Sequence, residues 1–163
     1  MKISVYCIGN LKEKYWSTAS DEYMKRIRRF SNIEICEFKE EACEDKPSES
    51  VIQKVKDKES RKFLDKVKNT DFCIALDLRG KQMTSVKFSE KLSDVMKGVI
   101  GNGKSNIVFF IGGSFGLSDE CVSKADLILS MSDMTFPHQM ARIILLEQIY
   151  RAFKINAGEV YHK

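Results

Sequence analysis

Hydrophobic and polar positions along the chain follow two patterns. Short, nearly continuous apolar runs are separated by longer segments in which apolar residues recur every three or four positions. The short runs are typical of buried strands, and the longer segments are typical of helices that bury one face. The pattern predicts strands over residues 3–9, 32–40, 71–80, 106–111 and 126–131. It predicts helices over residues 14–30, 51–68, 85–97 and 118–124, and a last helix from about Pro137 to Gly158.

This order of elements favours an α/β fold. Strands that alternate with helices, some of them apolar throughout, are typical of a parallel sheet covered by helices on both faces. The length of 163 residues suits one domain, and no internal repeat, low-complexity stretch or linker divides the chain. We therefore expect a single domain spanning residues 1–163, in which a parallel-rich sheet is flanked by helices. The third helix is expected to open with Ser85 as its cap.

The last predicted helix is apolar on almost every side. Ile143, Ile144, Leu145 and Leu146 are consecutive, and at about 100° per residue four positions cover most of a helix's circumference. A surface helix buries a single stripe. This helix is therefore expected to need apolar cover on two sides.

The composition is that of an ordinary globular protein, with 43% hydrophobic and 31% charged residues. A net charge of +4 permits a polyanionic partner without requiring one. No apolar run approaches the length of a membrane span, and the N-terminus lacks the apolar segment of a signal peptide, so we expect a cytoplasmic protein with no membrane partner. Five cysteines without a CxxC pair, together with only two histidines, argue for unpaired structural thiols and against a metal site.

Candidate chemistry gathers at the ends of three predicted strands. In open α/β sheets, ligands bind in the crevice beyond the carboxyl ends of the strands. The segments 76–80, 112–116 and 131–136 follow such ends and carry unusual residues. If their strands lie side by side, the three loops converge on one crevice.

The motif IGGSFG, residues 111–116, has two interpretations. Glycines after a buried strand let a ligand approach the backbone closely, and they also suit a tight strand-to-helix turn. The spacing GGxxG departs from the GxGxxG dinucleotide fingerprint, and the chain has no phosphate loop with GK[ST]. A nicotinamide or ATP enzyme is therefore disfavoured.

In the segment SMSDMTFPHQM, residues 130–140, the part before Pro137 combines three hydroxyl groups with three large apolar side chains. That mixture suits a flat heterocycle held by backbone hydrogen bonds and apolar walls, and the alternative is a simple connection to the last helix. Pro137 is expected to start that helix, because proline is favoured in a first turn. His138, just inside the helix, could be a capping group or a catalyst.

The C-terminal segment AGEVYHK ends in Tyr161, His162 and Lys163. A ring that can stack, an imidazole that can accept a proton and an ammonium that can bind phosphate would together suit an unstacked RNA base. The alternative is an idle terminus, since chain ends are usually frayed.

Taken together, IGGSFG, the segment SDMTFPHQMARIILLEQIYRAFKI and the ending GE-x-YHK make the chain recognisable. It resembles the ribosomal large-subunit pseudouridine N3-methyltransferase family, small members of the SPOUT class of S-adenosylmethionine-dependent, trefoil-knotted RNA methyltransferases. The opening IGNLKEKYW is similar too, so the resemblance covers the whole chain. Two positions depart from the pattern: Asn10 stands where a lysine is expected, and Val160 where proline or alanine is common.

The resemblance implies a C-terminal trefoil knot, in which the C-terminal part of the chain threads through a loop. It implies a homodimer whose last helix packs against its own sheet and against the partner chain, which would give residues 143–146 apolar cover on two sides. It also implies that S-adenosylmethionine lies bent in the knot, against Leu76, Gly112, Met131, Ser132, Asp133, Met134, Thr135 and Phe136.

The implied reaction is methyl transfer from S-adenosylmethionine to N3 of a pseudouridine in large-subunit (23S) ribosomal RNA. The protein's main tasks are then to align the methyl group with N3 and to help remove the N3 proton. The chain has no separate RNA-binding domain, so we expect it to act on the assembled ribosome. The expected roles are a general base at His162 or His138, positive charge from Arg142, base stacking by Tyr161 and phosphate binding by Lys163.

Two other functions are alternatives at this point. A knotted methyltransferase acting on transfer RNA would share the cofactor site. A non-catalytic RNA-binding module would keep the basic tail, but it would have no need for three convergent loops and no affinity for S-adenosylmethionine.

Overall fold

The computed structural model describes residues 2–104 and 106–161, along which strands and helices alternate as predicted. The strands are β1 (Lys2–Ile8), β2 (Asn32–Phe38), β3 (Asp71–Gln82), β4 (Asn106–Ile111) and β5 (Leu127–Ser130). The helices are α1 (Lys14–Ile27), α2 (Glu49–Leu64), α3 (Ser85–Met96), α4 (Asp119–Ser123) and α5 (His138–Asn156). Each corresponds to a predicted element, with differences of a few residues at the ends.

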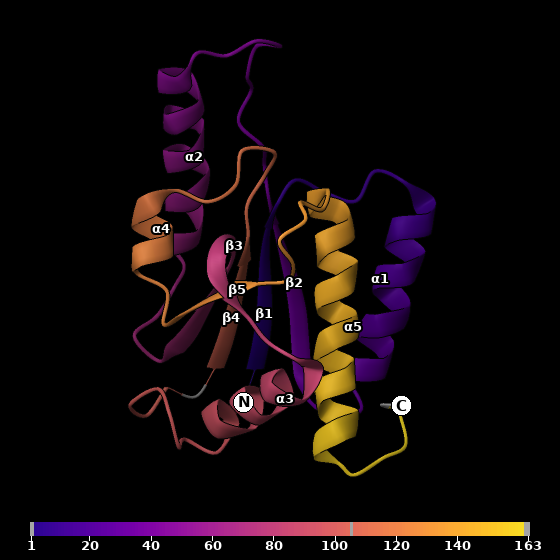
Figure 1. Cartoon of the computed structure of the whole chain (residues 1–163). Coiled ribbons are helices and arrows are strands. Elements are labelled where there is room, and N and C mark those ends of the chain that lie inside the picture. Colours follow the sequence, from indigo (N-terminus) through magenta and orange to yellow (C-terminus); the bar gives the residue numbers. More distant parts are fainter. Residues whose placement is uncertain (1, 105, 162–163) are drawn as a thin grey trace.

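The strands form one sheet in the order β2-β1-β4-β3-β5, and every neighbouring pair is parallel. Helices α1, α3 and α5 cover one face, and α2 and α4 cover the other (Figure 1). Alternate residues of a strand therefore enter different cores: Ile107 and Phe109 pack with α3 and α5, whereas Val108 and Phe110 pack with α2 and α4. Burial on both faces explains why these strands are apolar at consecutive positions, and it confirms the predicted parallel α/β sheet.

Two helix starts differ slightly from the predictions. Thr84, not Ser85, caps α3: its backbone is extended and its hydroxyl accepts a hydrogen bond from the N–H of Lys87 at 3.2 Å. Ser85 is the first helical residue, and its hydroxyl donates instead to Gln148 of α5. Pro137 lies one residue before α5, with an extended ψ of 138°, so it ends the preceding loop instead of occupying the first turn.

Helix α5 lies against the sheet between α1 and α3 (Figure 1). Leu145, Leu146 and Ile149 are fully buried in this core, so the expected burial on the sheet side is confirmed. Ile143 and Ile144 are only half-buried within the chain. Apolar surface on the second side of the helix thus stays accessible in a single subunit.

Strand β3 leaves the sheet and returns to it. Leu76 pairs with Leu129 of β5, and so does Lys81, so residues 77–80 form an excursion out of register. At its end Gly80 lies against the β5 backbone, where an added Cβ would be 2.6 Å from the carbonyl carbon and oxygen of Ile128. Glycine is required here because the contact is between two backbones.

No helix in the described part of the chain is long and apolar enough to cross a membrane. All five cysteines are free, and Cys7, Cys73 and Cys121 are buried. Burial raises the pKa of each of these three thiols to about 12. They therefore stay protonated near neutral pH and act as small hydrophobic residues, as the sequence predicted.

The backbone contact at Gly80 predicts a large cost for a small substitution. Gly80→Ala is expected to lower the free energy of unfolding by about 2–3 kcal/mol, because the methyl group would overlap backbone that cannot rotate away. Gly98→Ala is the matched control: no atom lies within 4 Å of its added Cβ, and its positive φ of 71° alone should cost about 1 kcal/mol. Urea unfolding at equal protein concentration measures both. If both variants lost the same free energy of unfolding, the close backbone contact at Gly80 would tolerate a side chain.

Candidate functional site

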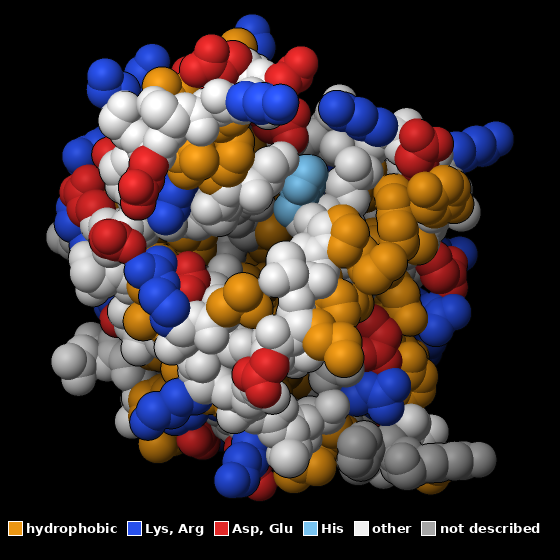
Figure 2. All heavy atoms as spheres, turned by 45° about the horizontal axis from the view of Figure 1, so that its top comes forward, with side chains coloured by type: hydrophobic (Ala, Val, Ile, Leu, Met, Phe, Trp, Pro, Cys, Tyr) orange, Lys and Arg blue, Asp and Glu red, His pale blue; other side chains and the backbone are white. Residues whose placement is uncertain are grey.

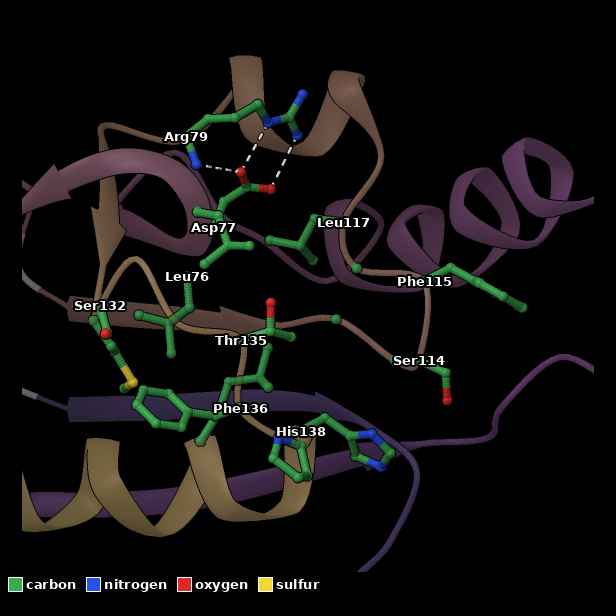
Figure 3. Close-up of a pocket in the computed structure, with 18 of the residues that line it drawn as sticks. Leu76, Asp77, Arg79, Ser114, Phe115, Leu117, Ser132, Thr135, Phe136 and His138 are labelled. Carbon is green, nitrogen blue, oxygen red and sulfur yellow. Dashed lines mark hydrogen bonds and ion pairs between the residues drawn. The ribbon is translucent and has the colours of Figure 1, made fainter. Parts of the chain in front are cut away.

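The three strand-end loops line one cavity, as the sequence predicted for neighbouring strands. Strands β4, β3 and β5 are adjacent in the sheet, and the segments that follow their carboxyl ends surround a space of about 840 Å³ (Figure 3). We call it the strand-end cavity. Its size is that of a site for a small molecule or cofactor. Seen from outside, the molecule is hollowed here, with hydrophobic side chains gathered to one side (Figure 2).

The β4 loop supplies backbone to the cavity wall. Gly112, Gly113 and Gly116 line it, and the N–H of Gly116 donates to the carbonyl of Gly113 at 3.0 Å. A Cβ at Gly112 would lie 2.5 Å from the carbonyl carbon of Gly116. The glycines are therefore needed for the tight turn itself, and that turn also exposes bare backbone to the cavity. The two interpretations of IGGSFG are compatible.

The β5 loop supplies apolar walls and few free polar groups. Met131, Met134 and Phe136 line the cavity, and Thr135 lies beside Phe136 (Figure 3). Ser132 lines it as well, but its hydroxyl accepts from the N–H of Met134 at 3.0 Å.

Two other polar residues of this loop fix its shape. The hydroxyl of Ser130 donates to the carbonyl of Ser132 at 3.0 Å. The side chain of Asp133 does not line the cavity, and its carboxylate accepts a hydrogen bond from the amide of Gln82. The Asp133 carboxylate is thus engaged outside the cavity.

A group of charged residues lies at the cavity edge, and the sequence indicated only the segment 76–80 that holds two of them, without a role for either. Asp77 and Arg79 lie in the β3 excursion, and Lys56 of α2 lines the same cavity. The Asp77 carboxylate accepts from the Arg79 backbone N–H at 2.9 Å, from Nε at 2.8 Å and from Nη2 at 3.0 Å. Arg79 Nη1 donates to Asp119 at 2.6 Å. We call Lys56, Asp77 and Arg79 the rim cluster, with Asp119 as the outer anchor of Arg79.

These contacts fix the charge states of Asp77 and Arg79. Hydrogen bonding to Arg79 holds the pKa of Asp77 below its ordinary value, and bonding to Asp77 and Asp119 raises the pKa of Arg79. Both groups are therefore ionised near neutral pH. The sequence offered only one signal, a charged pair directly after a buried strand, because the excursion that presents the pair depends on the distant strand β5.

His138 lies at the other side of the cavity from Asp77 and Arg79 (Figure 3). Its Nε2 is 3.8 Å from Oε1 of Glu40, beyond hydrogen-bonding distance. Burial lowers the pKa of His138, against a smaller opposing effect of Glu40. The imidazole is therefore mainly neutral near pH 7 and can accept a proton.

Arg142 does not line the strand-end cavity. Its side chain is 1% exposed, pairs with Glu37 of β2 through Nη1, and donates from Nη2 to the carbonyl of Gly9 at 2.9 Å. The expected role of Arg142 as a charge beside the reacting base is not supported by this position. It instead ties α5 to the ends of β1 and β2.

The described part of the C-terminal segment, residues 157–161, lies away from the cavity. The Tyr161 ring packs edge-on against Tyr150 at 5.0 Å between centroids, Arg151 lies over the ring at 4.7 Å, and the phenol donates to Glu147 at 3.3 Å. Tyr150 is twelve residues beyond His138 on α5, or about 18 Å along the axis. His162 and Lys163 lie outside the described residues.

Within residues 2–104 and 106–161, no group of three or more His, Cys, Asp and Glu side chains could hold a metal ion. The polar groups that line the cavity are hydroxyls, backbone, the imidazole of His138 and the rim cluster. The lining thus suits an organic ligand with an apolar part and a charged part.

The chain is similar along its whole length to known proteins. A family model described as "Predicted SPOUT methyltransferase" matches residues 1–162. The chain is 50% identical over 163 residues to a Clostridium novyi protein named ribosomal RNA large subunit methyltransferase H, and 46% identical to one of the same name from Clostridioides difficile. Each match covers 100% of this chain and 100% of the relative.

Two solved structures share the fold at low sequence identity. A methylase family protein from Haemophilus influenzae matches with a TM-score of 0.52 and 12% identity, over 99% of this chain and 70% of that one. The Legionella pneumophila methyltransferase Lpg2936, solved with its cofactor SAM bound, matches with a TM-score of 0.51 and 14% identity, over 93% of this chain and 66% of that one. At such identities the likeness concerns the fold alone.

Proposed function

The chain belongs to the SPOUT methyltransferase family, and from that premise we propose that it methylates N3 of a pseudouridine in large-subunit ribosomal RNA. One observation carries the proposal: three strand-end loops line a single cavity in a chain that aligns over its full length with ribosomal RNA large subunit methyltransferases H. A non-catalytic RNA-binding module would have no use for that cavity.

The proposed methyl donor is S-adenosylmethionine, which supplies a methyl group already activated on a sulfonium. The cavity fits its adenosyl part, because Leu76, Met131 and Phe136 offer apolar walls and Gly112 lets the backbone approach closely. Ser132, Met134 and Thr135 would complete this wall, and Asp133 would contribute backbone only. The trefoil knot is part of the same proposal.

Proton removal is assigned to His138 in preference to the other candidates. The N3–H of pseudouridine must lose its proton as the methyl group arrives, and a neutral imidazole can accept it. His138 is neutral near pH 7 and lines the cavity, whereas Arg142 is buried elsewhere as a cation paired with Glu37. His162 stays a candidate base that lies outside the described residues.

The position of Tyr161 supports a homodimer in which each tail serves the partner's cavity. Tyr161 packs beside Glu147 and Tyr150, toward the far end of α5 from its own cavity. Ile143 and Ile144 leave α5 with half-buried apolar surface, and Met134 is 73% exposed beside the cavity. A second copy covering this surface would satisfy the apolar second side of α5. In such a dimer Tyr161 and Lys163 would contact RNA at the partner's site.

Methyl transfer to different acceptors tests the function. With S-adenosylmethionine carrying a tritiated methyl group, label should enter large-subunit RNA of assembled ribosomes and yield N3-methylpseudouridine on nucleoside analysis. Transfer to protein-free ribosomal RNA should be at least about tenfold slower, because one small domain of net charge +4 offers little surface for selecting a nucleotide in naked RNA. Label in transfer RNA would replace this proposal with the knotted transfer-RNA enzyme.

Complementation between two inactive variants tests the tail in trans. A chain truncated after Gly158 keeps the cavity, and Leu76→Arg keeps the tail but fills the cavity; each alone should be inactive. Mixed at equal amounts and reassembled, they should recover about a quarter of wild-type turnover, because half of random dimers are mixed and each has one complete site. Native mass spectrometry confirms that mixed dimers form. Inactive mixed dimers would refute action in trans.

The acid limb of the pH profile tests His138. Single-turnover rates should be level near pH 7 and above, and fall about tenfold per pH unit below the pKa of His138, which lies under its ordinary value of about 6.5. Glu40→Gln should move this limb to lower pH, because Glu40 raises the pKa of the imidazole. His138→Gln should remove the limb and slow transfer about 10²-fold or more. A His138→Gln enzyme with an unchanged profile would assign the proton to another group.

A further inference from the structure

The charged residues of the strand-end cavity are of both signs and lie on one side of it. Within the described lining, Lys56 and Arg79 are positive, Asp77 is negative, and His138 on the opposite side is mainly neutral. The surface around the hollow shows Lys or Arg beside Asp or Glu on one side and hydrophobic side chains on the other (Figure 2). A ligand that carries a single charge would be attracted by one member of this cluster and repelled by another.

The cluster retains unused hydrogen-bonding capacity. A carboxylate can accept about four hydrogen bonds, and Asp77 accepts two at Oδ1 and one at Oδ2, so one position at Oδ2 is open. Arg79 has five side-chain N–H groups, of which Asp77 and Asp119 engage three. Lys56 makes no hydrogen bond or ion pair with any described residue within 4.0 Å. One acceptor position of Asp77, two N–H groups of Arg79 and the ammonium group of Lys56 are therefore unused among residues that line the cavity.

The cluster is also pre-organised. Two carboxylates hold the guanidinium of Arg79, and the Asp77 side chain is only 13% exposed. Fixed ionic groups in a partly buried site interact more strongly with a ligand than mobile surface charges do. The three bonds between Asp77 and Arg79 keep both groups at the cavity edge before any ligand arrives (Figure 3).

The ligand chemistry that matches this arrangement is an α-amino acid zwitterion. Its ammonium group would donate to Asp77, and its carboxylate would accept from Lys56 and Arg79. An RNA phosphate fits less well, because Asp77 and Asp119 would repel it. S-adenosylmethionine carries such a zwitterion at the end opposite its adenine.

We infer that the rim cluster binds the amino-acid end of S-adenosylmethionine, with Asp119 as a positioning residue for Arg79. This inference rests on the proposed function. The adenosyl part would then lie along Leu76, Leu117 and Phe136, away from the charged edge. The cluster thereby fixes the direction in which the cofactor lies in the cavity.

Calorimetric titration with two ligands tests the inference. S-adenosylhomocysteine keeps the amino-acid end, whereas methylthioadenosine has the same adenosyl thioether without it. Lys56→Gln and Asp77→Asn should each weaken S-adenosylhomocysteine binding about tenfold, the loss expected for a hydrogen bond to a charged group. Both variants should leave the affinity for methylthioadenosine within about twofold of wild type.

Two control variants separate the charge effect from other causes. Lys54→Gln removes an exposed lysine of α2 that does not line the cavity, so it should change neither affinity. Leu76→Ala should lower the affinity for both ligands, because it removes part of the apolar wall that would contact the adenosyl group. Urea unfolding of each variant shows whether the fold is intact. Lys56 lies on a helix surface and has no bonded partner among the described residues, so Lys56→Gln is expected to keep the fold. The binding test can therefore still be made with this variant if Asp77→Asn unfolds.

Several results would overturn the inference. Equal affinity of the wild-type protein for both ligands would show that the amino-acid end gains nothing in this site, while the proposed function would stand. If Lys56→Gln lowered the affinity for both ligands equally, the cluster would act on the shape of the cavity and not on the amino-acid end. Unchanged S-adenosylhomocysteine binding together with weaker ribosome binding would assign Lys56 to RNA. Failure of the wild-type protein to bind either ligand would instead reject the cofactor, and with it the proposed function.

Discussion

The cavity depends on the double pairing of β3 with β5. Leu76 and Lys81 both pair with Leu129, so the chain must leave the sheet after Leu76 and return within four residues. This return brings Gly80 against the β5 backbone and leaves Asp77 and Arg79 at the cavity edge. The return of β3 to the sheet thus closes one wall of the cavity and also places the charged groups at its edge. A side chain at Gly80 would disturb both features at once.

The two arginines near the ends of the sheet show how burial decides a role. Arg142 is 1% exposed and its side chain bonds Glu37 and the Gly9 carbonyl, so its charge is used inside the fold. Arg79 is about half exposed and is held by two carboxylates without using all its donors. A buried cation that lost its partners would destabilise the protein, whereas a fixed cation at a cavity edge can still bind a ligand.

Most elements could be predicted from sequence because their apolar residues have a local pattern, and α5 is long enough to leave little ambiguity. The run of β4 has only six residues, and the glycines that follow it favoured a strand. The convergence of the three loops could be stated only as a condition, since strand order depends on contacts across the whole chain. The position of Arg142 was missed for the same reason: its partners Glu37 and Gly9 are 105 and 133 residues away. The rim cluster followed from a register shift against β5, which no local pattern encodes. The misplaced cap at Ser85 was a choice between adjacent hydroxyl residues, and the extended backbone at Thr84 decided it.

Helix α5 connects the two halves of the proposed site. Its first turn carries His138 at the cavity, and its later turns hold Tyr161 through Glu147 and Tyr150. Tyr150 lies twelve residues beyond His138, or about 18 Å along the helix axis, too far for both side chains to contact one base. In a two-fold symmetric dimer that pairs α5 with α5, the two helices run in opposite directions, because the same surface of each subunit contacts the other. Each tail would then lie beside the partner's cavity. The half-buried Ile143 and Ile144 lie between His138 and Tyr150, where the two-fold axis of such a dimer would pass. The apolar second side of α5 and the separation of tail from cavity therefore have one explanation in the proposed dimer.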